Sequence, residues 1–299
     1  VTERGYESPA VLEPFVAGLR QRAQTDAGPL AIVPCDNLPA NGEVARRALE
    51  SRSDDAGWLT WLSDQVSFVS TVVDRITPRP RNSDRDKVAR LTGWADEVPV
   101  ITEPYAEWLL AGEFPAGRPH WESAGARIVD DVTPFERRKL WMLNGAHTTL
   151  AAIGLLRGHG TVAAALADPV ALEMVEAFWA DAMAQLPGVE VESYRASLLE
   201  RFANPRIEHR LAQIAESGLE KVRVRIAPVA LGALGSGGRA TGATIAIAAW
   251  IASTTEHGEA DALRVVSPEL ADEADFRALV VESVRDLRAA GTATVISSK

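Results

Sequence analysis

The sequence is poor in cysteine and in long apolar runs. Cys35 is the single cysteine among 299 residues, so neither an internal disulfide nor a cysteine-based zinc cluster can form. No stretch reaches the roughly 18 apolar residues that a membrane span needs, and the longest candidate, residues 240–253, is interrupted by threonine and glycine. A charged leader followed by an apolar run is also missing, so we expect no secretory signal. These absences favour a reducing, cytoplasmic setting without a membrane partner.

An excess of basic residues is lacking as well. The formal net charge is −10 at pH 7, which argues against a nucleic-acid partner because phosphate backbones are bound by Lys and Arg. Only four residues are lysines, at positions 87, 139, 221 and 299, so each is worth locating. Hydrophobic residues make up 46% of the chain, and at about 150 residues per domain the length predicts two domains with sizeable cores.

The first 125 residues are predicted to be mixed α/β. An apolar run at Leu30–Val33, followed by turn residues, is typical of a buried parallel strand. A second, valine-rich strand is expected over Val66–Ile76, and a helix at Glu43–Ser51 separates the two. This order predicts a strand–helix–strand unit. In such sheets ligands bind beyond the carboxyl ends of the strands, here at Cys35–Pro39 and Val73–Ile76.

The remainder, residues 126–299, is predicted to be mainly helical. The Gly- and Pro-rich segment Gly112–Ala126 is the expected linker. A helix starts sharply at Thr133, with Pro134 in its first turn and Glu136 in capping-box position, and it is expected to run to about residue 157. The predicted fold class is therefore α/β followed by all-α. Further helices are expected at residues 169–186, 191–202, 204–218, 241–253 and 268–290.

The helix after Thr133 carries polar side chains on the face of its leucines, if each residue turns by about 100°. A buried lysine loses proton affinity through desolvation and can act as a base. Asparagine and histidine can donate hydrogen bonds to an oxygen that gains negative charge. Such a set suits alcohol–ketone interconversion by hydride transfer to a nicotinamide, and it needs no metal. The polar residues on this face are Glu136, Lys139, Asn144 and His147.

Two other interpretations fit parts of the sequence. On spacing alone, Lys139 could reach solvent, Asn144 could cap a turn and His147 could be an ordinary core histidine. In addition, Gly235–Ala240 fits the nucleotide-binding pattern G-x-G-x-x-A. We interpret it as a loop between helices, because Pro228–Leu234 separates its glycines from the nearest possible strand, Val222–Ile226.

Motifs along nearly the whole chain resemble those of one enzyme family. The most specific one, Lys139 with Asn144 and His147, is similar to a Lys-x4-Asn-x2-His signature. Together the motifs resemble the mannitol dehydrogenase family of polyol-specific long-chain dehydrogenases, which also includes arabinitol dehydrogenases and fructuronate/mannonate oxidoreductases. The other matching segments are Val1–Tyr6 (VTERGY), Cys35–Gly42 (CDNLPANG), Val73–Pro78 (VDRITP), Glu103-Pro104 with Gly117–Pro119, and Arg201–Pro205 with His209-Arg210.

The resemblance implies an oxidoreductase that uses NAD or NADP. It would interconvert a polyol or sugar acid and the corresponding ketose or keto form, without a metal. Lys139 would be the general base, Asn144 and His147 would polarise the substrate oxygen, and Glu136 would lie on the proton path from Lys139 to solvent.

The resemblance also implies binding residues. Asn37 and Asp74 would contact the substrate, and Val73 would lie beside the nicotinamide. Arg210 and Lys221 would hold polar groups of the substrate.

One family feature is missing upstream of these motifs. The family usually carries a Gly-rich phosphate-binding turn well before the VTERGY segment, and nothing precedes Val1 in this sequence. Residues 1–125 would then be the C-terminal part of a Rossmann-type dinucleotide-binding domain, and residues 126–299 the helical substrate and catalytic domain. We expect little activity from these residues alone. The alternative is a non-catalytic, truncated sugar-binding or scaffold protein, and the individual substrate, the choice between NAD and NADP and the oligomeric state stay open.

Overall fold

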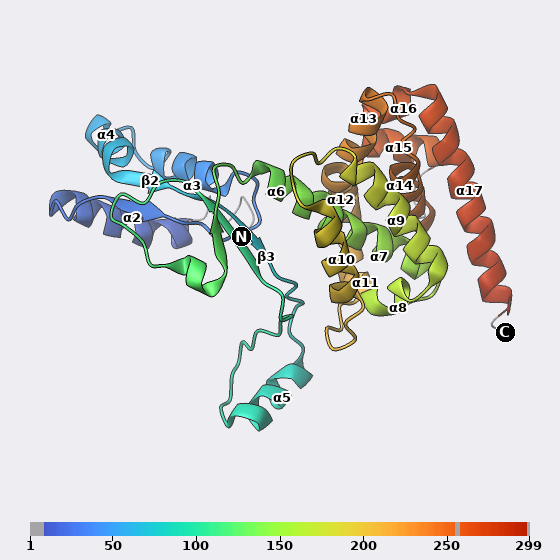
Figure 1. The fold of residues 1–299 in the computed structure, drawn as a ribbon, viewed down its shortest axis with the longest axis horizontal. Coiled ribbons are helices and arrows are strands. Elements are labelled where there is room, and N and C mark those ends of the chain that lie inside the picture. The colour runs from blue at the N-terminus through green and yellow to red at the C-terminus, as the bar shows by residue number, and fades with distance from the viewer. Residues whose placement is uncertain (1–8, 255–257, 298–299) are drawn as a thin grey trace. The chain divides into compact units, whose positions relative to one another are not determined.

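The structure, a computed structural model, describes residues 9–254 and 258–297, so the VTERGY segment lies outside the described residues. The chain forms two compact units. Unit 1 comprises residues 1–76 and 104–136, and unit 2 comprises residues 77–103 and 137–299. All strands of the described residues belong to unit 1, whereas unit 2 is helical (Figure 1). The predicted fold class, an α/β region followed by a mainly helical one, is thereby confirmed.

Unit 1 contains the predicted strand–helix–strand unit. Strands β1 (Leu30–Ile32) and β2 (Val66–Phe68) pair in parallel, with Leu30 opposite Val66. They are connected through α3 (Asn41–Glu50) and through α4 (Ala56–Gln65), a helix that the sequence analysis did not predict. A further helix, α2 (Pro9–Gln24), precedes β1.

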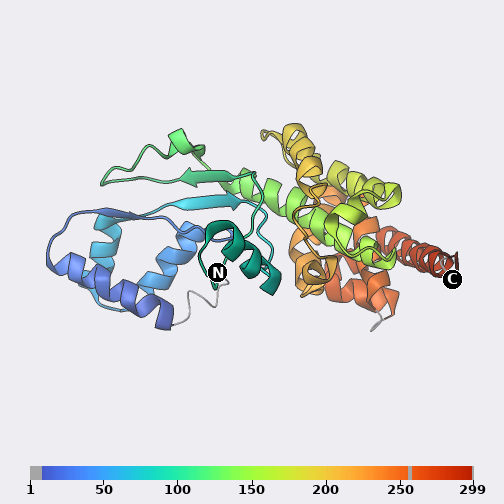
Figure 2. The same cartoon turned by 90° about the horizontal axis from the view of Figure 1, so that it is seen from below.

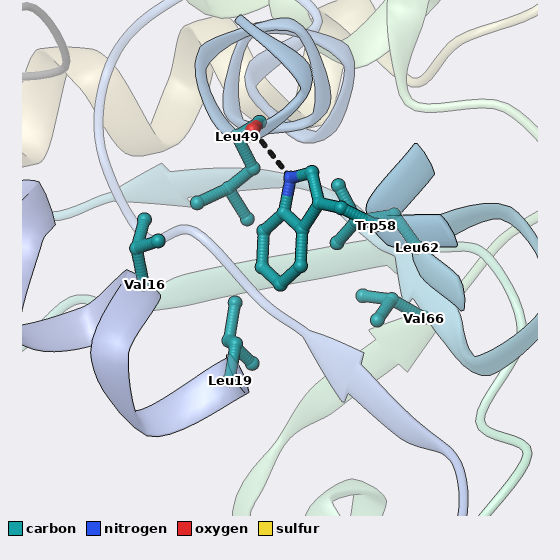
Figure 3. Packing of buried hydrophobic residues seen from close by; sticks show 6 residues of the cluster. All are labelled: Val16, Leu19, Leu49, Trp58, Leu62 and Val66. Carbon is teal, nitrogen blue, oxygen red and sulfur yellow. Dashed lines mark hydrogen bonds between the residues drawn. The ribbon is translucent and has the colours of Figure 1, made fainter. Parts of the chain in front are cut away.

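Trp58 lies in the hydrophobic core of this unit. It is only 6% exposed, and its Nε1 donates a hydrogen bond of 3.3 Å to the carbonyl oxygen of Leu49 (Figure 3). Because that bond satisfies its only polar atom, the large ring is buried without an unpaired donor. This core ties the helices of unit 1 to β2. Around the ring lie Val16, Leu19, Leu49, Leu62 and Val66.

The second predicted strand, Val66–Ile76, is wrong as a single element. After β2 the chain continues as β3 (Ser70–Asp74), which belongs to a different sheet and pairs antiparallel with β4 (Glu107–Ala111) (Figure 2). The buried residue between them, Val69, donates its N–H to the carbonyl of Ile32. The run of valines continues through this junction, so local periodicity gives no sign that the strand changes partner.

The Gly- and Pro-rich segment predicted as a linker connects β4 to β5 (Ala126–Ile128), which pairs in parallel with β4. It contains the short 3₁₀ helix η1 (Trp121–Ala124) and lies within unit 1. Trp121 packs against Trp108 of β4, with ring centroids 5.1 Å apart. The segment is therefore anchored by aromatic packing on the three-stranded sheet.

Unit 2 is organised around α14 (Thr241–Ser253), whose bounds match the prediction. This helix packs against α7 (Ala146–Leu156), α9 (Pro169–Met183) and α17 (Ala274–Ser297). A Cβ atom at Gly242 would come within 2.0 Å of the Ala177 carbonyl oxygen, so glycine permits direct contact between α14 and α9. The remaining helices are α5 (Asn82–Thr92), α8 (Val162–Leu166), α10 (Val191–Phe202), α11 (Leu211–Ala215), α12 (Gly218–Arg225), α13 (Ala227–Gly235), α15 (Glu259–Val266) and α16 (Pro268–Asp272).

The predicted helix over residues 204–218 is much shorter than expected. Only α11 forms, because the preceding residues make a turn in which Asn204 Oδ1 accepts from the N–H of Arg206. Arg210 then forms an isolated antiparallel bridge with Thr161. The segment predicted as one helix over residues 268–290 is also divided, between α16 and α17.

A buried ion pair joins two of the matched motifs in unit 2. Arg201 of α10 donates to Glu103 through Nη2 at 2.8 Å and through Nε at 3.0 Å. Both side chains are at most 5% exposed. Nearby, the exposed side chain of Arg79 pairs with Glu216 at 3.2 Å. These pairs attach the segment that contains α5 to the helices of unit 2.

The glycines at the G-x-G-x-x-A pattern end a helix rather than open a nucleotide site. Gly235 is the last residue of α13, the possible strand before it is helix α12, and the N–H of Gly238 bonds back to the Ala233 carbonyl. Gly237 has a φ of +80°, and no heavy atom beyond its own residue and chain neighbours lies within 4 Å of the position that a Cβ atom would take.

Gly237→Ala should therefore cost about 1–2 kcal/mol of stability from backbone strain and leave cofactor affinity unchanged. Urea unfolding and NAD titration measure the two effects. Gly235→Ala, in a helix without positive φ, is the matched control and should not destabilise; lost NAD binding in Gly237→Ala alone would contradict this interpretation.

Asp168 should make the stability of unit 2 depend on pH. It caps α9 through Val170, and Arg157 and His159 donate to it at 2.5 and 2.8 Å. The hydrogen bonds from Arg157, above all, hold the pKa of Asp168 well below its usual range. Its contribution is thus present above about pH 4 and is lost as pH falls below that value. Asp168→Asn should cost about 2–3 kcal/mol at pH 7 and progressively less as pH falls below about 4, as measured by urea unfolding. Glu173→Gln, at an exposed position of the same helix, should have no such dependence, and a cost for Asp168→Asn that stays constant with pH would refute the assignment.

Candidate functional site

The helix that begins at Thr133 changes its winding at Lys139. Helix α6 (Thr133–Arg138) is followed by a π-helix, η2 (Lys139–Gly145), and then by α7. The uniform turn of 100° per residue that was assumed from the sequence is therefore wrong here. Hydrogen bonds in a π-helix run from i to i+5, so Asn144 lies nearer the face of Lys139 than the uniform turn predicts. His147, three residues further on, continues the same stripe.

Side chains from elsewhere in unit 2 stabilise this π-helix. A π turn disturbs the regular ladder of backbone hydrogen bonds, and its carbonyl groups need other donors. Trp179 Nε1 donates to the Met142 carbonyl at 2.8 Å, and Arg225 Nη1 donates to the Asn144 carbonyl at 3.3 Å. A Cβ atom at Gly145 would meet the ring of Phe178 at 2.6 Å, so glycine lets the helix approach α9 closely.

His147 is a buried, neutral imidazole. It is 5% exposed, its ring stacks on Phe202 with centroids 4.4 Å apart, and it meets His209 edge-on at 4.8 Å. Burial, reinforced by the charges of His209, Arg225 and Arg201, lowers its pKa well below the usual value. Its Nε2 is buried and has no hydrogen-bond partner among the described residues. An imidazole held neutral with an unused nitrogen is suited to hydrogen bonding with a ligand oxygen.

Lys139 and Asn144, on the same helical segment as this histidine, are partly exposed. The stripe therefore combines one amine, one amide and one neutral imidazole. Chemically, these groups can accept a proton and donate hydrogen bonds to an oxygen.

His209 is a residue of this region that the sequence analysis matched but assigned no role. Its pKa is lowered by burial and by the charge of Lys221, and its Nδ1 is buried without a partner in the described part of the chain. The neighbouring Arg210 is exposed, with Nη2 3.5 Å from Glu208. Backbone bonds to the segment after α7 fix this dipeptide, since the N–H of Val162 bonds to the His209 carbonyl. The role predicted for Arg210 stays a prediction, and only its place next to His209 could have drawn attention to the histidine.

The side chain of Lys221 binds backbone carbonyl groups in unit 2. Its Nζ donates to the carbonyls of Ile214 and Glu216 at 2.7 and 2.5 Å, at the end of α11. Burial is the main cause that lowers its pKa. Because an ammonium group has three N–H bonds, one remains for the substrate contact that the sequence predicts.

The other predicted site residues belong to unit 1. Asn37 is exposed in the loop after β1, where Asp36 Oδ1 accepts from the N–H of Leu38 at 2.9 Å. Val73 and Asp74 end β3, and Asp74 is 1% exposed. Both the loop after β1 and the end of β3 are strand ends beyond which the sequence predicted a ligand.

Glu136 connects to the same loop. Its Oε1 accepts a hydrogen bond of 3.0 Å from the N–H of Ala40. Within unit 1, the carboxylate predicted on the proton path is thus bonded to the loop that carries Asn37.

Asn41 is a positioning residue that sequence reasoning missed. It is fully buried, donates to the carbonyl of Pro34 at 3.2 Å and accepts from the N–H of Thr71 at 2.8 Å. These bonds fasten the loop after β1 to β3. Its position within the matched CDNLPANG segment was the available signal.

Neither a metal centre nor a membrane span emerges from the described ranges. Within residues 9–254 and 258–297, no three His, Cys, Asp or Glu side chains gather so as to hold a metal ion. No helix in those ranges is both long and apolar enough to cross a membrane.

Comparison with known proteins covers both parts of the chain. Residues 1–123 match the family model of the mannitol dehydrogenase Rossmann domain, and residues 131–288 match that of the mannitol dehydrogenase C-terminal domain. D-mannonate oxidoreductase of Escherichia coli (strain K12) is 35% identical over 268 residues, which are 86% of this chain and 54% of that protein. Mannitol 2-dehydrogenase of Aspergillus fumigatus is 34% identical over 221 residues, 71% of this chain and 44% of that protein.

Solved structures agree with these matches. Pseudomonas fluorescens mannitol 2-dehydrogenase, in a ternary complex with NAD and D-mannitol, has a TM-score of 0.78 at 27% identity and covers 98% of this chain and 68% of its own. A D-sorbitol dehydrogenase in substrate-free form has a TM-score of 0.81 at 27% identity, and the match covers 93% of this chain and 65% of that protein's chain. The chain spans about half the length of the curated relatives it matches. With both of its parts matched in order, the chain belongs to the mannitol dehydrogenase family.

Proposed function

We propose that the protein carrying this chain is an NAD- or NADP-dependent dehydrogenase that oxidises a secondary alcohol of a polyol or sugar acid to a ketone, and catalyses the reverse reduction. The observation that supports it most is the stripe formed by Lys139 and Asn144 on the π-helix and by a neutral, buried His147 at the start of α7. Family membership supports the same reaction.

Each residue of the stripe has a distinct task in this proposal. Lys139 Nζ takes the proton from the reacting hydroxyl group. The Asn144 amide and an N–H of His147 donate hydrogen bonds to the oxygen as negative charge develops on it. Because His147 is neutral, it stabilises this oxygen without giving up its own proton. Glu136 returns the proton from Lys139 to solvent.

The nicotinamide, when bound, supplies the acceptor for the hydride that leaves the substrate carbon. The parallel pair β1–β2 and the loop after β1 fit this group, since parallel α/β sheets bind ligands beyond the carboxyl ends of their strands. Val73, partly exposed on β3, would contact the nicotinamide, whereas Asn37 and Asp74 would orient the substrate. Arg210 and Lys221 would hold polar substrate groups.

A substrate panel tests this function. The gene-encoded protein that contains residues 1–299 is incubated with D-mannitol, D-sorbitol or D-mannonate and with NAD or NADP, and nicotinamide reduction is followed by absorbance. We expect turnover of at least one substrate. Binding of a panel sugar without turnover under any condition would instead support a non-catalytic sugar-binding protein.

A further inference from the structure

The guanidinium of Arg225 lies in unit 2 without an acidic partner. Its Nη1 donates to the Asn144 carbonyl and to Thr148 Oγ1 at 3.3 and 3.2 Å, while its Nε is buried and has no acceptor within the described residues. No carboxylate lies within ion-pair distance of it in that part of the chain. Burial lowers the pKa of Arg225 to about 10, and the group therefore stays charged at neutral pH.

Such an arrangement is costly for folding alone. A buried charge normally has a counter-ion, and an unpaired donor loses the free energy of its hydration. The contact with Asn144 occupies only part of the guanidinium and does not neutralise it. The residue keeps some accessible surface. An anionic ligand would supply both the acceptor that the Arg225 Nε–H lacks and the negative charge that the guanidinium lacks.

Neighbouring groups favour the same ligand. Arg225 contacts Asn144 and Thr148, the residues on either side of His147 along the helix, and His209 packs against the ring of His147. His209 Nδ1 and His147 Nε2 are also buried without partners among the described residues. Arg225 and His209, each with an unused buried polar atom, therefore both contact the helical segment that carries Asn144 and His147.

We propose that Arg225 and His209 bind a carboxylate group of the substrate, so that the substrate is a sugar acid rather than a neutral polyol. His147 then remains available to the reacting oxygen. This inference rests on the proposed function and narrows its substrate class. Arg guanidinium groups pair well with carboxylates because their N–H groups match the two oxygens.

The experiment measures binding to the 299-residue chain by calorimetry. D-mannonate and D-mannitol share a six-carbon skeleton and differ at a carboxylate, so the pair isolates the charged group. We expect D-mannonate to bind at least about tenfold more tightly than D-mannitol. Arg225→Met should weaken D-mannonate binding by about ten- to a hundredfold, the scale of a lost charge-assisted hydrogen bond. D-mannitol binding should weaken much less, because only the lost support of the π-helix affects that ligand.

Control variants separate this effect from damage to the fold. Arg223→Met, at an exposed position of the same helix where the side chain donates to the Val265 carbonyl, should change neither affinity. Arg225→Lys keeps the charge and loses the planar fork, so it should give an intermediate loss. The wild-type comparison needs no variant and stands even if Arg225→Met fails to fold.

Several outcomes would overturn the proposal. It fails if D-mannonate shows no binding, if it binds no more tightly than D-mannitol, or if its affinity survives in a folded Arg225→Met chain. It also fails if inorganic phosphate or NAD, rather than D-mannonate, loses affinity in that variant, since the cation would then serve the cofactor.

Oxidation assays test the proposed dehydrogenase function separately from the carboxylate site. Oxidation of D-mannitol but not D-mannonate would leave the dehydrogenase assignment intact and refute the carboxylate site. Arg225-dependent D-mannonate binding without oxidation would do the reverse.

Discussion

Lys139→Ala should reduce turnover of the gene-encoded protein by at least about a hundredfold, the usual scale for a lost general base. Of the three residues of the stripe, Lys139 is the one assigned as the base, because burial keeps His147 neutral and the amide of Asn144 does not take up a proton. Oxidation by the unchanged protein should also become faster as pH rises, since the base must be unprotonated. The variant should lose this pH dependence. Steady-state kinetics across pH measure both effects.

Substrate affinity should change much less than turnover in Lys139→Ala, and small added amines should restore part of the rate. Lys87→Ala is the matched control, because Lys87 is exposed on α5. It should leave turnover unchanged. If Lys139→Ala lowered only the melting temperature and left turnover intact, Lys139 would be a solvent-reaching lysine without a catalytic role.

Glu103→Gln should destabilise unit 2 by about 3–5 kcal/mol, the typical cost of breaking a buried ion pair by removing one partner. The carboxylate receives hydrogen bonds from Nε and Nη2 of Arg201, and both side chains are almost fully buried. The substitution takes away the negative charge that compensates the buried guanidinium. Urea unfolding followed by far-UV circular dichroism, which reports on the helices, measures the loss.

Glu208→Gln provides the comparison for this ion pair. Glu208 pairs with Arg81 and Arg210 at the surface, with its side chain 41% exposed. Exposed pairs contribute at most about 1 kcal/mol, so this variant should remain close to the unchanged chain. Equal costs for the two variants would show that the Glu103–Arg201 pair does not hold the segment 77–103 to unit 2. Replacing both partners, Glu103→Leu with Arg201→Met, should cost less than Glu103→Gln, because no charge is then left buried.

Where the signal was local, the sequence predicted the structure well. Leu30–Val33 and the following helix gave the parallel strand pair, because an apolar run bounded by turn residues can be buried on both faces. The helix expected to start at Thr133 does begin there, and the side chain of Asp168 caps the helix that begins at Pro169. The strand at Val66–Ile76 was misjudged since nothing local marks the point where the chain leaves one sheet for another.

The sequence by itself determined the family and the fold class, and it predicted the polar stripe, because motifs and periodicity are properties of neighbouring residues. The tertiary structure decided how that stripe is arranged. Trp179 and Arg225 bond to carbonyls of the π-helix that are 37 and 81 residues away in the chain, and this support allows the π turn between Lys139 and Asn144. Likewise, the bridge between Thr161 and Arg210 accompanies the turn that leaves Arg210 exposed and His209 against His147. Such donors and contacts come from distant parts of the chain, so no local pattern could have predicted them.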